Sequence, residues 1–103
     1  MLHWAEDYFV GKGIKDPDAV RKKLDQQKLA VGIFLLTFSR NNQNLMELLP
    51  ASMLKQRANY ERCPEIFGMA KGKDGAIDLM TEILVTCYQK NGNYNLKEYL
   101  RNR

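Results

Sequence analysis

The sequence predicts an α/β fold, in which a small and at least partly parallel sheet is flanked by helices. Two apolar stretches, at about 29–38 and 65–71, have the composition of buried strands. The stretches with helical spacing or helix-start signals lie at about 17–27, 44–60, 75–90 and 95–101. The length of 103 residues is that of one domain, so we expect residues 1–103 to form a single folded unit.

The helix at 17–27 has a clear start signal. Asp16 is suited to cap the first free backbone amides, and Pro17 has the backbone angle that the first turn of a helix requires. Val20 and Leu24 lie one turn apart and form a narrow apolar stripe. We therefore expect a short amphipathic helix that packs on the sheet through this stripe.

The stretch at 29–38 is apolar on both faces that a strand would present. Alternate residues from Val31 to Thr37 share one face, and Phe34, Leu36 and Phe38 share the other. This pattern is typical of an interior strand of a parallel sheet, which is covered above and below.

The region at 44–60 is expected to be helical and to connect the two strands. Leu45 to Leu49 follow a polar turn and have a helical pattern, and Pro50 ends or kinks this helix because proline lacks a backbone donor. Pro50 can equally begin a second helix, from Ala51 to about Tyr60. A helical connection of this kind predicts that the two strands are parallel neighbours.

The second strand, at 65–71, leads into the clearest helix of the sequence. On one face of this strand, Gly68 has no side chain and Ala70 has a small one, so that a neighbouring element can approach this face closely. The helix at 75–90 has apolar residues at helical spacing and ends before Gly92. The short helix at 95–101 begins with a capping-box spacing of Asn and Glu.

The first fifteen residues fit two interpretations. The spacing of Leu2, Ala5 and Tyr8 favours a helix or an irregular segment, whereas the stretch from Asp7 to Gly11 fits a third strand. We favour a helix or an irregular segment over the strand. Because two parallel strands alone make a poor sheet, a third strand must then come from a terminus or from a second copy of the chain, which predicts a homodimer.

Charge and cysteine content narrow the classes of function. The formal net charge is +4, and the basic residues are dispersed among acidic ones, as on a solvated surface, so we do not expect a nucleic-acid partner. The two cysteines, Cys63 and Cys87, are expected to be free thiols in a reducing compartment. The N-terminus lacks the features of a secretion signal and no apolar run is long enough to span a bilayer, so we expect a cytoplasmic protein without a membrane partner.

The sharpest candidate site is the loop at 71–75, between a predicted strand and a predicted helix. Its glycines and lysines, placed before a helix N-terminus, are the components of an anion site, and Arg40 would join it from the neighbouring loop. The residues of this candidate anion site are Arg40, Lys71, Gly72, Lys73 and Gly75. The loop matches no phosphate-binding motif, so an ordinary exposed turn is the competing interpretation.

The residues that could take part in catalysis do not combine into a recognisable catalytic arrangement. His3 is the single histidine and lies near the chain start, and Asp16 and Asp18 have the spacing of helix caps. We expect no metal and no cofactor, and we expect a non-enzymatic binding or protein-interaction module that self-associates. The alternatives are a phosphate- or nucleotide-binding domain that uses the loop at 71–75, and a nucleic-acid-binding accessory protein.

Overall fold

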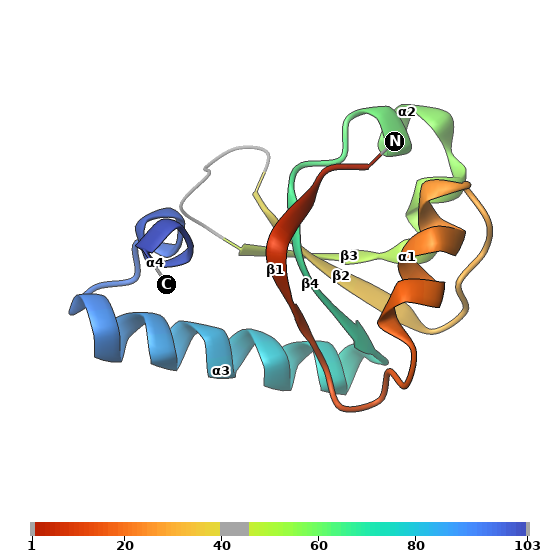
Figure 1. The fold of residues 1–103 in the computed structure, drawn as a ribbon. Coiled ribbons are helices and arrows are strands. Elements are labelled where there is room, and N and C mark those ends of the chain that lie inside the picture. The colour runs from red at the N-terminus through yellow and green to blue at the C-terminus, as the bar shows by residue number, and fades with distance from the viewer. Residues whose placement is uncertain (1, 40–45, 103) are drawn as a thin grey trace.

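The computed structural model describes residues 2–39 and 46–102, which form a four-stranded mixed sheet with helices on both faces (Figure 1). The strands are β1 (Trp4–Val10), β2 (Ile33–Phe38), β3 (Met46–Pro50) and β4 (Ile66–Lys71), in the order β1-β4-β2-β3. The helices are α1 (Pro17–Asp25), the 3-10 helix η1 (Ala51–Lys55), α2 (Arg57–Glu61), α3 (Lys73–Asn91) and α4 (Leu96–Asn102). The predicted α/β class with a partly parallel sheet is confirmed, since β1 and β4 run in the same direction.

The strand β1 lies where we expected a helix or an irregular segment, so that expectation is wrong. It pairs in parallel with β4, with Val10 opposite Met69, and the Gly11 amide extends the pairing by donating to the Met69 carbonyl at 2.8 Å. The helical spacing of the N-terminus was misleading because β4, far along the chain, supplies the hydrogen-bonding partners that a local pattern does not reveal.

The strands β2 and β4 are neighbours, as predicted, but they run antiparallel rather than parallel. Ile33 pairs with Lys71 and Thr37 pairs with Ile66. The reason is that β3 first runs back along β2, and η1 and α2 then return the chain to the end of the sheet where β3 began. The last residue of β2, Phe38, therefore lies at the opposite end of the sheet from Lys71.

The strand β3 replaces the first half of the helix that we predicted at 44–60. Leu48 pairs with Leu36 and Leu49 with Leu35, so this segment takes its backbone hydrogen bonds from β2. The second half of the predicted helix is present only as two short helical segments, η1 and α2. With β1 and β3 the sheet has four strands, so the shortage of strands that predicted a homodimer does not exist.

The other three predicted helices are present and have the expected end signals. Asp16 caps α1 by accepting a hydrogen bond of 3.1 Å from the Ala19 amide, and Gly92 ends α3 with a positive φ of 73°. The amide of Glu98 donates to the Asn95 side chain at 3.1 Å and so caps α4. No helix within residues 2–39 and 46–102 has both the length and the apolar character that crossing a membrane requires.

The sheet separates two apolar cores. On one face Leu24 of α1 packs with Leu35 and Met69 of the sheet, and on the other face the buried side of α3 packs with Leu36 and Phe67. Because successive residues of a strand point to opposite faces, this contact pattern places α1 and α3 on opposite sides of the sheet. Figure 1 shows the sheet between the two helices.

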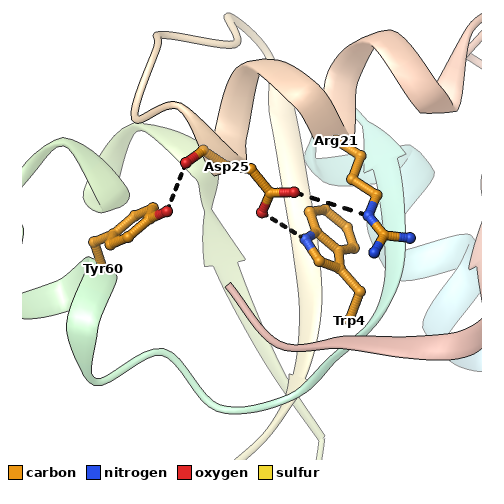
Figure 2. A network of polar contacts seen from close by, with 4 residues as sticks. All are labelled: Trp4, Arg21, Asp25 and Tyr60. Carbon is orange, nitrogen blue, oxygen red and sulfur yellow. Dashed lines mark hydrogen bonds and ion pairs between the residues drawn. The ribbon is translucent and has the colours of Figure 1, made fainter. Parts of the chain in front are cut away.

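A polar network ties α1 to the rest of the molecule (Figure 2). The Asp25 carboxylate accepts a hydrogen bond of 2.9 Å from the indole nitrogen of Trp4 and lies 3.9 Å from Nε of Arg21. The Tyr60 hydroxyl donates to the Asp25 carbonyl at 2.6 Å. The guanidinium of Arg21 also lies over the Trp4 ring at 5.3 Å, which is within the range of a cation–π contact. These contacts fix α1 relative to β1 and hence position the loop between them.

Candidate functional site

The two parallel strands, β1 and β4, end side by side at one edge of the sheet. From β1 the chain turns to α1 on one face, and from β4 it turns to α3 on the other face. In open α/β sheets, a crevice forms where the connections of neighbouring parallel strands separate in this way, and ligands bind there. Figure 1 shows the β1–α1 connection and the start of α3 at this same end of the sheet.

The loop that follows β1 lies unusually close to β4. A Cβ atom placed on Gly11 would lie 2.9 Å from the Cβ of Ala70, and one placed on Gly13 would lie 2.8 Å from the Cβ of Lys71. Real Cβ atoms do not approach so closely, so glycine is needed at both positions. These two glycines bring the backbone of one loop directly against the start of the other.

The loop that follows β4 turns into α3 at Gly72. This residue has a φ of +76° and caps the helix without a side-chain hydrogen bond. Its amide is already used, since it donates to the Gly32 carbonyl at 2.7 Å. The next three amides, of residues 73–75, lie in the first turn of α3, where no carbonyl one turn earlier in the helix can accept from them.

A first hollow, of about 350 Å³, lies between these loops on the side of α3. Its charged residues are two lysines, Lys12 and Lys71, and two acids, Asp78 and Glu82. The acids lie on the flank of α3, and Gly75 lines the hollow near the start of the same helix. This volume falls at the small end of the range of ligand pockets, which begins at about 300 Å³.

A second hollow, of about 400 Å³, adjoins the same edge on the side of α1. Three lysines line it, namely Lys15, Lys23 and Lys71, against the single carboxylate of Asp16. That carboxylate already accepts a hydrogen bond from the amide of Ala19. Gly13 and Lys71 line both hollows, so Lys71 marks the point where the two adjoin.

The ion pairs found within residues 2–39 and 46–102 lie elsewhere. They join Arg21 to Asp25 and Arg57 to Glu61. The lysines of the two hollows have no carboxylate at ion-pair distance among the described residues, and their positive charge is therefore open to a ligand.

Comparisons with protein-family models, with curated proteins and with solved structures find no match. The crevice must therefore be interpreted from its own chemistry.

The predicted anion site is only partly assembled at this edge. Lys71 lines both hollows and Gly75 lines the first, whereas Lys73 is exposed and lines neither. Gly72 shapes the turn, but its amide donates within the protein. Arg40 lies outside the described residues, and β2, which precedes it, runs away from this edge.

The sequence interpretation missed the other half of the crevice. The residues it missed are Gly11, Lys12, Gly13, Lys15, Lys23, Asp78 and Glu82. A signal was present, because the sequence Gly-Lys-Gly at 11–13 begins with the last residue of the stretch from Asp7 to Gly11 that also fitted a strand. Choosing the strand would have placed these glycines in a loop at the sheet edge.

The linings of both hollows consist of charged residues, apolar residues and glycine. No serine, threonine, cysteine, histidine or tyrosine is found among the described residues that line either hollow. Within the same described part of the chain, no group of three histidine, cysteine or acidic side chains is arranged to hold a metal ion. The crevice therefore offers lysine and carboxylate side chains, and its lysines are groups that can hold an anion.

Proposed function

We propose that this chain is a small-ligand-binding domain that holds an anionic group at the edge of the sheet between β1 and β4. One observation carries the proposal: two neighbouring parallel strands send their connections to opposite faces, and Lys71 lies in the crevice between them. This is the position at which ligands bind in open α/β sheets.

The charges at this edge support an anion as the bound group. Lys15, Lys23 and Lys71 converge on one hollow from the β1–α1 loop, from α1 and from the end of β4. Lysine binds phosphate and carboxylate groups as a mobile point charge, and several lysines around one hollow act additively on an anion. The side chains are exposed, so they adjust to a ligand without the cost of burying a free charge.

Thermal unfolding in the presence of inorganic phosphate tests this function. A ligand that binds only the folded state at ten times its dissociation constant stabilises it by about 1.4 kcal/mol. For a domain of this size that raises the melting temperature by about 5 °C or more. We expect this rise in phosphate and not in chloride of equal ionic strength.

Two variants make the test specific for the crevice. Lys71→Gln removes the cation shared by the two hollows, and we expect it to abolish the rise. Lys55→Gln removes the same charge from η1, which does not line the crevice, and should leave the rise intact. An equal rise in both variants, or no rise at tens of millimolar phosphate, contradicts the proposal.

Protein interaction, including self-association, is the second candidate function. The outer side of α3 exposes Val85 and Tyr88, at 49% and 51%, and Tyr88 stacks against the exposed Tyr94 with 5.0 Å between ring centroids. Neighbouring exposed apolar side chains of this kind favour a protein partner. We expect Val85→Glu to reduce any dimer seen by light scattering at high micromolar concentration, and Gln89→Glu to leave it unchanged. A monomeric wild-type chain contradicts self-association.

A further inference from the structure

The basic excess of the crevice lies in the hollow beside α1. That hollow is lined by Lys15, Lys23 and Lys71 against the single carboxylate of Asp16, so its described lining has an excess of two positive charges. The hollow on the side of α3 has as many acidic as basic residues in its described lining. A phosphate monoester carries a charge of about −1.5 to −2 near neutral pH, which matches the excess in the hollow beside α1.

The other residues that line the hollow beside α1 are mostly apolar. Ile14 and Val20 are half-buried and pack against the core on this face of the sheet. Ala30 and Ile33 belong to that core, with only 7% and 8% of their surface exposed. The hollow thus combines an apolar wall, continuous with the core, with three exposed lysines.

Val31 lines the same hollow and is the most exposed large apolar side chain in the described part of the chain, at 80%. The backbone that follows it is held at the end of β4. The Gly32 carbonyl accepts a hydrogen bond of 2.7 Å from the Gly72 amide, and Ile33 pairs with Lys71 in the sheet. The connection before β2 therefore holds an exposed apolar side chain at a basic hollow, where the apolar part of a bound molecule can cover it.

We infer that the ligand is a phosphate monoester whose ester group is apolar, such as an aryl or a short alkyl group. The inference rests on the proposed function and places the whole ligand in the hollow beside α1. The phosphate lies among Lys15, Lys23 and Lys71, and the apolar group covers Val20 and Val31. The volume of this hollow, about 400 Å³, falls within the range of small-molecule sites, about 300 to 1,000 Å³.

A sugar or another polyhydroxylated ester group fits this hollow less well. Asp16 supplies the only carboxylate of the described lining, and one of its oxygens already accepts a hydrogen bond from the Ala19 amide. Hydroxyl groups placed against Ile14, Val20 and Val31 would lose water without gaining a hydrogen-bond partner, which is unfavourable.

Isothermal titration calorimetry with two matched esters tests the inference. The probes are methyl phosphate and phenyl phosphate, which share the charged group and differ in the size of the apolar part. Both are titrated into the full chain, with inorganic phosphate as the third probe. We expect phenyl phosphate to bind at least about tenfold more tightly than methyl phosphate, because covering about 60 Å² of apolar surface contributes that factor.

The variant Val31→Asn removes the exposed apolar contact at a position so exposed that the core does not depend on it. We expect this variant to lose most of the gain of phenyl phosphate over methyl phosphate and to keep the affinity for methyl phosphate. The matched control is Leu29→Asn, which changes another exposed apolar residue of the same connection that lines neither hollow. This control should keep the gain.

The outcomes separate the inference from the proposed function. If inorganic or methyl phosphate binds and phenyl phosphate binds less than about tenfold more tightly, the inference is wrong and the proposed function stands. A gain that persists undiminished in Val31→Asn, or that falls equally in Leu29→Asn, also contradicts the inference. If none of the three probes binds, the inference and the proposed function are both wrong.

Discussion

The indole nitrogen of Trp4 donates a hydrogen bond of 2.9 Å to the carboxylate of Asp25, and this contact joins the start of β1 to the last turn of α1. The Asp25 side chain is only 17% exposed. The backbone carbonyl of Asp25 accepts a hydrogen bond from the Tyr60 hydroxyl. Tyr60 lies near the end of α2, just before the chain continues to β4. One residue thus joins three elements on the face of the sheet that α1 covers.

Removing the indole donor should destabilise the fold. Trp4→Phe leaves one oxygen of a largely buried carboxylate without its partner, and we expect the free energy of unfolding to fall by about 1.5 to 3 kcal/mol. Urea denaturation measures this change. Arg57→Gln, which breaks the exposed ion pair with Glu61, should cost about 0.5 kcal/mol or less. Equal losses in the two variants would contradict the role of Asp25.

The Tyr60 hydroxyl should make the free energy of unfolding depend on pH in the alkaline range. Burial raises the pKa of Tyr60 above its ordinary value of 10.0, and the charge of Asp25 raises it further. Because the folded pKa is the higher one, the protonated phenol stabilises the fold fully below about pH 10, and this contribution is lost as the pH rises through the folded value.

The variant Tyr60→Phe isolates this contribution. Near neutral pH it should be less stable than the wild type by about 1 kcal/mol, because the hydrogen bond to Asp25 is lost. As the pH rises above about 10 and through the higher folded pKa, the wild type loses this contribution, so the difference in the free energy of unfolding should shrink. Urea denaturation from pH 8 to 11 measures the difference, and a constant value over that range would exclude the hydroxyl as its source.

Substituting alanine for two glycines of the crevice should change the free energy of unfolding in opposite directions. Gly13→Ala places a methyl group 2.8 Å from the Cβ of Lys71, and we expect a loss of about 1 to 3 kcal/mol in the free energy of unfolding. Gly75→Ala meets no atom within 4 Å and lies in the first turn of α3, so it should stabilise by up to about 1 kcal/mol. A neutral Gly13→Ala would show that the two loops are not in close contact.

The two thiols should be protected in the folded chain. Cys63 and Cys87 are both buried, and burial raises the pKa of Cys87, with a further contribution from Glu98. The Cys87 thiol also donates to the Asn93 carbonyl at 3.5 Å. We expect Ellman's reagent at pH 8 to modify both thiols roughly a hundredfold more slowly than in urea, since reaction requires local opening. Equal rates in the folded chain and in urea would show that the core around the modified thiol is open, beside α3 for Cys87 and on the α1 side of the sheet for Cys63.

The helices α1, α3 and α4 were predicted because their end signals are local. The cap of α1 at Asp16, the left-handed end of α3 at Gly92 and the cap of α4 at Asn95 are each set by a few consecutive residues. The interior strand β2 was also predictable, since both of its faces are apolar. These elements do not depend on which distant segment they contact.

The directions of the strands could not be predicted in the same way. Whether β4 runs with or against β2 depends on the path between them, and that path changed when residues 46–50 became a strand instead of a helix. Both misassigned strands, β1 and β3, lie at the edges of the sheet, where the burial pattern is weaker.

For the candidate site too, the parts that depend on local sequence could be predicted, and the parts that depend on strand pairing could not. The turn from strand to helix within residues 71–75 was predicted from its own glycines and lysines, and in the structure it lies at Gly72, between β4 and α3. The loop at 11–15 was missed because its role depends on the pairing of β1 with β4. Arg40 was assigned to the site only because β2 was expected to end at the same edge as β4, and β2 in fact ends at the other.

The most direct test of the crevice is a titration of the chain with inorganic phosphate, followed by the backbone amide signals in nuclear magnetic resonance. We expect the amides of residues 11–15 and 71–75 to shift together and to saturate with one dissociation constant. The amides around Lys97 and Arg101, which line a hollow away from the crevice, should stay in place. Shifts that spread over every lysine-bearing surface without saturation, or that leave residues 11–15 unchanged, would contradict a ligand site between β1 and β4.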